Sequence, residues 1–392
     1  MRSDHQDRTG PSANRAKSSN WVRAAVGGLV VLAGLTTPST SAHAQTPMIE
    51  FIQPSAGFTF VSIRDIADDG TIVAMSYNGS APTTSPILRY SPGGGRQELA
   101  VGSGPRISGD GNVIGFNSAS DSLHPNLLYS NGTQHPVPGI IYRGQLQTGG
   151  VFTHLNHDGS VAMLQTATSV SDRTAFRWTQ SNNAVRLPPI PGGSTWNQTY
   201  GMSSDGSIVV GAGAPNSSFP DTPWSWTDGG PSLDTVLDPN GQAIFNGRLT
   251  AISGDGTRRY GWYSPDNNAQ VPIMITGGVA TPIIWDGVLT GGNNAPTGAS
   301  FDGGVLVGQY GGDSWIWTEA TGAMRAAEFF ITKGLVVDSE MSFSRIRVSN
   351  DGLHFAAETG PTRGVLVTIP APGAMGSLIL AGTLATTRRR RR

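Results

Sequence analysis

The sequence of 392 residues contains no cysteine, which excludes disulfide bonds, thiolate metal sites and a cysteine nucleophile. Lysine occurs only as Lys17 and Lys333, and charged residues make up 14% of the chain. A helical protein normally carries more alanine, leucine, glutamate and lysine. With 53 glycines and 26 prolines, this composition favours short strands and many turns.

Basic residues are also scarce between the two ends of the chain. Residues 45–387, which exclude the N-terminal segment and five C-terminal arginines, hold 16 basic and 25 acidic side chains, a net charge of −9. Phosphate binding needs grouped lysine and arginine, so such an acidic body argues against a nucleic-acid partner.

The N-terminal apolar run is too short to cross a bilayer. Residues 24–35 would form a helix of roughly 18 Å, whereas the hydrocarbon core is ~30 Å thick. Basic residues precede this run and Ala42-His43-Ala44 follows it, which is the layout of a secretory signal peptide. We therefore expect residues 1–44 to be a signal peptide, and the protein to be exported to the cell surface or the extracellular space.

One short phrase, an Asp-Gly pair between two apolar runs, recurs along the rest of the chain. The seven aspartates are Asp69, Asp110, Asp158, Asp205, Asp255, Asp302 and Asp351. Asp-Gly between alternating segments is a strong hairpin signal, and a period of 40–50 residues is typical of β-propeller blades. The sequence therefore predicts an all-β fold over residues 45–369, a seven-bladed propeller of four-stranded antiparallel blades. We expect these aspartates to be structural turn residues, since single carboxylates in separate blades cannot share a calcium ion.

Each copy also predicts four strands. A second apolar run follows the turn, often with a small residue six positions after the Asp, and a third strand ends in an aromatic residue in most copies. Those aromatic residues are Tyr90, Tyr129, Trp178, Trp226 and Trp317. We interpret them as packing between blades; a track of ligand-binding aromatics is the alternative. The last copy ends after its third strand, residues 364–368, so we expect residues 48–53 to supply its fourth strand and close the ring.

The C-terminal segment, residues 370–392, joins a proline-containing tetrapeptide, a short apolar stretch and five arginines. It resembles the PEP-C-terminal sorting signals of exported bacterial proteins, with Pro370-Ala371-Pro372-Gly373 in place of the usual Pro-Glu-Pro. The resemblance implies transient anchoring in the inner membrane and processing by an exosortase-like enzyme after passage through the export machinery. Ala371 departs from that pattern, and a plain C-terminal membrane helix is the alternative.

The repeats resemble the HAF-type extracellular repeat. "MSSDGSIVVG" (202–211) and "AFRWTQSNNAVRLPPI" (175–190) carry the similarity, which extends over most of residues 59–368. This resemblance implies an exported protein built from β-rich repeats.

The sequence contains no G-x-S-x-G elbow, Walker loop or H-E-x-x-H motif. His154 and His157 form an H-x-x-H pair without a nearby third ligand, and strand alternation predicts that they point to opposite faces. We therefore expect no metal, no cofactor and no catalytic function.

The clearest candidate ligand site combines stacking area with amide groups. Trp196, Asn197, Gln198 and Tyr200 follow a Gly-rich loop, on the face expected to lie opposite the Asp-Gly turns. The sequence thus predicts a non-catalytic structural or binding module that docks a glycan, an envelope component or a protein there; an ordinary ordered loop is the alternative. A second hypothesis is an extracellular polysaccharide lyase or hydrolase, which paired carboxylates or a His-Arg-Tyr set at the channel mouth would favour.

Overall fold

The structure is a computed structural model. It describes residues 47–79, 85–119, 125–137, 140–142, 145–147, 150–169, 172–181, 183–188, 197–213, 221–228, 230–232, 237, 241–242, 246–265, 269–284, 294–360 and 362–371. All of them belong to the compact unit His43–Arg392. The predicted signal peptide, and the sorting segment from Pro372 onward, lie outside the described residues. No helix within the described residues is long and apolar enough to cross a membrane.

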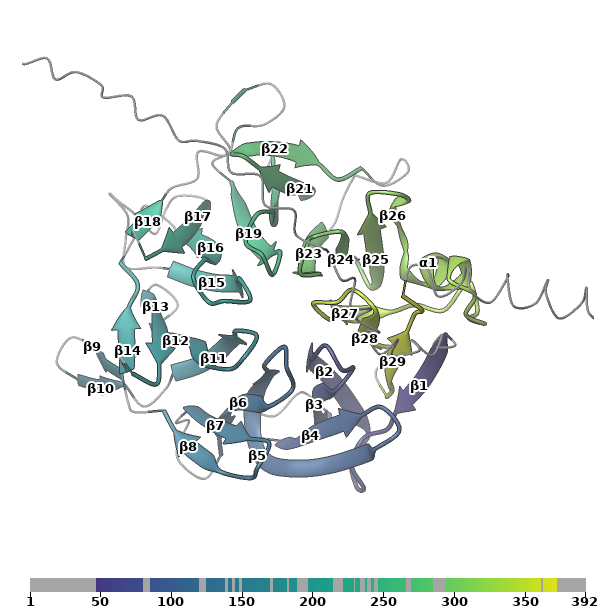
Figure 1. Ribbon diagram of the computed structural model, residues 1–392, viewed down its shortest axis with the longest axis horizontal. Helices are drawn as coiled ribbons and strands as arrows, with labels where there is room; N and C mark the ends of the chain where they lie inside the picture. Colours follow the sequence, from purple (N-terminus) through teal and green to yellow (C-terminus); the bar gives the residue numbers. More distant parts are fainter. Residues whose placement is uncertain are drawn as a thin grey trace, which may run out of the picture. The chain divides into compact units, whose positions relative to one another are not determined.

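Five antiparallel sheets of four strands are arranged around a common centre (Figure 1). Four of them are built from consecutive strands. These are β11 (Gly150–Leu155), β12 (Val161–Ser169), β13 (Asp172–Thr179) and β14 (Asn183–Arg186); β15 (Asn197–Met202), β16 (Val209–Gly213), β17 (Thr222–Thr227) and β18 (Gly230–Ser232); β19 (Gly247–Ile252), β20 (Arg259–Tyr263), β21 (Val271–Thr276) and β22 (Val279–Pro282); β23 (Asn294–Ala299), β24 (Val305–Tyr310), β25 (Asp313–Thr318) and β26 (Gly322–Arg325). A separate pair joins β9 (Ile140–Tyr142) to β10 (Gln145–Gln147).

The fifth sheet is closed by the N-terminal strand. It has the order β1 (Met48–Ile52), β29 (Gly364–Thr368), β28 (His354–Glu358) and β27 (Ser344–Val348). Strand β1 runs antiparallel to β29, with Met48 opposite Thr368 and Ile52 opposite Gly364. As the sequence predicts, residues from the start of the body supply the outer strand that the last copy of the repeat lacks.

The first two copies of the repeat share one sheet of seven strands. Its order is β2 (Phe60–Ile66), β3 (Ile72–Tyr77), β4 (Ser85–Ser91), β5 (Gly95–Ile107), β6 (Val113–Ser118), β7 (Pro125–Tyr129) and β8 (Gln134–Pro136). The N-terminal part of β5 pairs with β4 and its C-terminal part pairs with β6.

The expectation of seven separate four-stranded blades is therefore wrong. Within the described residues the propeller has five four-stranded blades, and the seven-stranded sheet takes the place of two further blades of that kind. The reason lies in chain length: Asp69 and Asp110 are 41 residues apart, whereas the later intervals are 47 to 50 residues. No residues remain for a connecting loop, so the outer strand of the first copy continues directly as the inner strand of the second.

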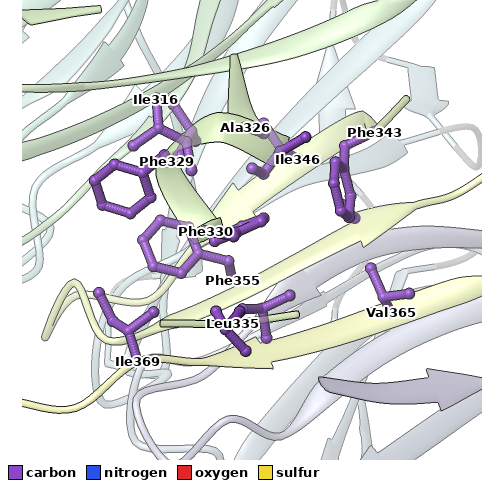
Figure 2. Close-up of a cluster of buried hydrophobic side chains, with 14 residues drawn as sticks. Ile316, Ala326, Phe329, Phe330, Leu335, Phe343, Ile346, Phe355, Val365 and Ile369 are labelled. Atoms are coloured by element: carbon purple, nitrogen blue, oxygen red, sulfur yellow. The ribbon is translucent and has the colours of Figure 1, made fainter. Parts of the chain in front are cut away.

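The all-β fold contains one short helix, at a place where the repeat predicts a fourth strand. Of residues 322–329, "GAMRAAEF", only β26 is a strand, and α1 (Ala326–Thr332) follows it at once. Figure 2 shows how Phe329 and Phe330 of this helix lie against Phe343 and Phe355; the ring centroids of Phe330 and Phe355 are 5.4 Å apart. The helix thus fills the core between the last two sheets with aromatic side chains.

The remaining core lies between neighbouring sheets. Trp178 packs in one buried cluster with Val113 and Leu127 of the preceding copy, and Trp226 packs with Met163 and Ala175 in another. These contacts show that at least these two of the repeated aromatics pack between neighbouring sheets.

Candidate functional site in the central channel

The innermost strands line a central channel. They are β11, β15, β19, β23 and β27 of the four-stranded sheets, together with β2 and the C-terminal part of β5. In all seven the strand register shifts by one residue shortly before the Asp of the turn. The shifts lie between Ile63 and Asp65, Ser103 and Arg106, Phe152 and His154, Thr199 and Gly201, Leu249 and Ala251, Pro296 and Gly298, and Ser344 and Arg347. Such β-bulges re-aim side chains, and the residue that ends each shift, such as Asp65 or Arg106, lines the same cavity of about 500 Å³.

The two sides of this cavity differ in chemistry. Strands β27, β2, β5 and β11, which are neighbours around the ring, contribute what we call the cationic wall. It consists of Arg64, Asp65, Arg106, His154 and Arg347. Strands β15, β19 and β23 contribute the small-residue wall. It consists of Gly201, Thr250, Ala251, Thr297 and Gly298.

The arginines of the cationic wall bridge neighbouring inner strands. Arg106 donates from Nε to the carbonyl of Thr153 on β11 and from Nη1 to the carbonyl of Arg64 on β2, at 3.0 Å. Arg347 donates to the same Arg64 carbonyl at 3.3 Å. These carbonyls belong to bulge residues, so the guanidinium groups satisfy backbone acceptors at places where the strand pairing is irregular.

Burial and like charge both act on the ionisable groups of this wall. Burial, and then the nearby charge of Arg106, lower the pKa of Arg347 to about 10. Burial and the charges of Arg106 and Arg345 also lower the pKa of Arg64. Burial raises the pKa of Asp65 although Arg106 and Arg347 oppose the shift. Burial and the same two arginines lower the pKa of His154 to about 3, so its imidazole is neutral at ordinary pH.

Several polar atoms along the cavity have no hydrogen-bond partner among the described residues. They are Arg64 Nε, His154 Nδ1, Gln165 Nε2 and Thr250 Oγ1, and all four residues line the channel. Because an unpaired buried polar group costs free energy, native proteins normally pair such groups with protein, water or a ligand. These four atoms are buried within the walls, so the polar groups that a molecule in the channel can contact belong to the half-buried side chains of Arg64, Arg106, Arg347 and Tyr200.

Side chains cross the channel at the end that carries the Asp-Gly turns. The residues preceding each Asp form a ring of contacts, in which Asp68 donates its N–H to Gly109, His157 to Ser204, and Phe301 to Asn350. The Asp68 carboxylate accepts the N–H of Asn350 at 2.7 Å and lies 3.0 Å from His157 Nε2. Ser204 Oγ donates to Asn350 Oδ1 at 3.3 Å, across the ring. These contacts narrow the cavity at this end.

Each turn aspartate accepts a hydrogen bond from the backbone N–H two residues later. Asp302 is representative: its carboxylate accepts from Gly304 N–H at 2.8 Å and from Ser300 Oγ at 2.9 Å. These bonds, that of Gly304 foremost, lower the pKa of Asp302. The following glycine has a positive φ in all seven turns, for example +68° at Gly303.

The residues selected from the sequence for ligand binding lie in different environments. Trp196 lies outside the described residues. Asn197 and Gln198 begin β15 and are only 2% and 7% exposed, so little of either side chain is available to a ligand. Tyr200 does line the channel; its hydroxyl donates to Gln198 Oε1 and accepts from Arg248 Nη1 at 2.9 Å. Of the sorting motif, Pro370 and Ala371 follow β29 as irregular backbone, and Pro372 and Gly373 lie outside the described residues.

His154 and His157, expected on opposite faces, line the same cavity, because β11 ends at Leu155 and His157 lies in the turn, where strand alternation no longer applies. In the part of the chain that the structure describes, no group of three or more His, Asp or Glu side chains is placed to hold a metal ion.

The sequence-based predictions did not include the cationic wall, although the sequence contains a signal for it. Four positions before each Asp, the seven copies carry Asp65, Arg106, His154, Gly201, Ala251, Gly298 and Arg347. Ionisable residues at a position that is otherwise Gly or Ala stand out when the copies are aligned on their turns. Single motifs do not reveal them, because each copy contributes only one or two.

No protein-family model matches the chain, and no curated protein matches its sequence. Among solved structures, the β-propeller domain of the trilobed protease from Pyrococcus furiosus is similar with a TM-score of 0.50 and 11% identity, covering 79% of this chain and 95% of that one. An acylaminoacyl peptidase from Pyrococcus horikoshii has the same TM-score and identity, over 83% of this chain and 54% of its own. A prolyl endopeptidase also gives 0.50 and 11%, over 80% and 51%. The chain thus spans about half the length of the two peptidases, and at these identities the likeness shows the β-propeller fold alone.

Proposed function

We propose that the protein is an exported, non-catalytic β-propeller module that binds an extracellular polysaccharide in its central channel, entering from the face opposite the Asp-Gly turns. One observation carries this proposal. The cavity measures about 500 Å³, and it is lined by the half-buried polar side chains of Arg64, Arg106, Arg347 and Tyr200. A concave site with a few convergent polar groups is the usual form of a ligand site.

The direction of entry follows from the turn end, where Ser204 and Asn350 meet across the ring. Export rests on the resemblances of the two chain ends and of the repeats, and we propose transient anchoring through residues 370–392 on the same basis.

The test is a binding screen of the purified protein against extracellular polysaccharides, with a variant that fills the channel. Thr250→Phe places a ring in the cavity without breaking a hydrogen bond, because Thr250 Oγ1 has no partner among the described residues. We expect this variant to weaken binding about tenfold or more, since steric exclusion removes the ligand's contacts. Thr281→Phe, on the exposed part of outer strand β22, is the matched control and should bind normally. Equal binding by both variants would place the site outside the channel.

A second candidate is an enzyme acting on an acidic polysaccharide, because His154, Arg106 and Tyr200 line the same cavity. In a β-elimination, the neutral imidazole of His154 would accept the C5 proton of a uronate while an arginine neutralises its carboxylate; the C4–O bond would break, and the Tyr200 hydroxyl would donate a proton to the leaving oxygen. Incubation with polyuronates, followed by ultraviolet detection of unsaturated products, separates this candidate from pure binding. Product formation that His154→Gln abolishes would establish the enzyme; binding without product would favour the module.

A further inference from the structure

The cationic wall contains more positive than negative groups. Arg345 approaches Glu358 to 3.7 Å, and Glu358 also accepts the N–H of Ile63, so these two charges largely compensate each other. Three guanidinium groups remain, those of Arg64, Arg106 and Arg347, and they face the single carboxylate of Asp65. His154 adds no charge at ordinary pH.

This surplus is unfavourable in the structure as it stands. The three half-buried guanidinium groups line one cavity; in addition to burial, the charges of Arg106 and Arg64 lower the pKa of Arg347, and the charge of Arg106 lowers the pKa of Arg64. Like charges in a partly desolvated site repel each other more strongly than in water. A bound anion would relieve that repulsion.

We propose that the cationic wall binds an anionic group of the polysaccharide, a carboxylate or a sulfate ester, so that the channel selects acidic over neutral chains. This inference rests on the proposed function and specifies its ligand. Arg64 is the residue available for the contact, because its half-buried guanidinium donates no hydrogen bond to a described residue, whereas Arg106 and Arg347 already donate to backbone carbonyls. Guanidinium groups suit oxyanions because their donors form a planar fork that matches two oxygens.

The net negative charge of residues 45–387 makes the grouping of arginines in the cationic wall more informative. Residues 45–387 carry a net charge of −9, which repels acidic polymers at long range. Selectivity for such a ligand therefore requires cations grouped at the site itself. The only lysine of this body, Lys333, follows helix α1 and does not line the channel.

The experiment uses two pairs of probes, each with the same sugar backbone and with an acidic and a neutral member. Oligogalacturonate is compared with its methyl ester, and dextran sulfate with dextran, by titration calorimetry on the purified protein at low and high salt. We expect one acidic probe to bind at least about tenfold more tightly than its neutral counterpart, with an affinity that falls as salt rises. The acidic probe that binds identifies carboxylate or sulfate as the group. A neutral probe that binds equally well overturns the inference and leaves the polysaccharide module intact; absence of binding by every polysaccharide overturns both.

The variant Arg64→Gln tests whether Arg64 contacts the anionic group. We expect it to weaken binding of the acidic probe about tenfold and to leave thermal stability unchanged or slightly higher, because it removes a repelled charge without removing a hydrogen bond to a described residue. The matched control is Arg363→Gln at an exposed position away from the channel, which should behave like the unmodified protein. Undiminished acidic binding in Arg64→Gln would overturn the assignment of the anionic group to this wall.

Discussion

The two walls of the channel are built on the same repeat, but their sheets carry different residues on the innermost strands and on the second strands behind them. In the sheets behind the small-residue wall, the second strands carry Gly211, Gly261 and Gly308 six residues after the Asp of the turn. A Cβ at Gly211 would lie 1.9 Å from the carbonyl oxygen of Gln198 on the inner strand. At the same position, sheets behind the cationic wall carry larger residues, such as Phe116 and Leu164.

This difference shows that the same backbone structure can carry two walls of different chemistry. Bulges occur on both sides of the channel, so they belong to the fold and do not by themselves make a site. What distinguishes the cationic wall is that charged side chains occupy positions at which the opposite wall carries uncharged residues, which are Gly, Ala, Thr and, on β15, Tyr200. The small-residue wall leaves open the space into which those charged groups face.

The largest effect is expected from deleting residues 48–53. Strands β27 and β2 of the cationic wall come from opposite ends of the chain, and β1 completes the sheet of β27. Losing this strand should lower the melting temperature by on the order of 10 °C or prevent folding, since a whole strand of pairing and its core contact at Ile52 are removed. Amide hydrogen exchange should increase more in β27 and β2 than in β19.

A point substitution in the same strand provides the control for this deletion. Phe51 is 47% exposed, so Phe51→Ser should change the melting temperature little. A deletion variant that melts like the intact protein would refute closure by β1.

The second strands of the two sides should lose different amounts of stability when one methyl group is added or removed. Gly211→Ala forces a Cβ against the backbone of β15, so we expect it to cost about 3 kcal/mol or more, measured by denaturant unfolding. Ala357→Gly, at the same position behind the cationic wall, removes a methyl group and should cost only about 1 kcal/mol. Similar small costs for both would show that the two sides are packed alike.

The smallest expected effect is acid sensitivity, which should not distinguish the walls. Hydrogen bonds hold the pKa of Asp302 below its ordinary value, so the ionised form is favoured in the folded protein. Its contribution is therefore complete above the pKa of an unfolded aspartate and is lost as pH falls through the lower folded value.

Asp302→Asn should accordingly cost about 1 kcal/mol at about pH 7 and much less at about pH 3. Asp110→Asn, in a turn of the cationic side, should behave in the same way, because Asp110 accepts from Asn112 N–H and Ser108 Oγ and its pKa is also lowered. Exposed Asp228→Asn serves as the control. A cost that does not diminish in acid would show that these carboxylates do not stabilise the turns as ions.

Local sequence signals accounted for much of the fold. The Asp-Gly turns, the third strands and the closure by residues 48–53 each follow from a pattern a few residues long. The number of separate blades does not follow from such a pattern, because two separate blades need a connecting loop between them. The first interval of 41 residues is too short to contain that loop. Helix α1 escaped because it lies between elements of the repeat, where the period gives no guidance.

The candidate site was harder to predict than the fold. Its residues lie on four strands that are about 40 to 280 residues apart in sequence, and bulges that no local motif encodes bring them to one cavity. The stretch chosen from the sequence contains Tyr200, which lines the channel, but its amide residues Asn197 and Gln198 are buried at the start of β15.

A crystal structure of the protein with a bound acidic oligosaccharide tests the asymmetric channel most directly. We predict electron density for the sugar between the two walls, with an oxyanion within hydrogen-bonding distance of Arg64. Density on the outer strands, with the channel free of sugar, would contradict the account.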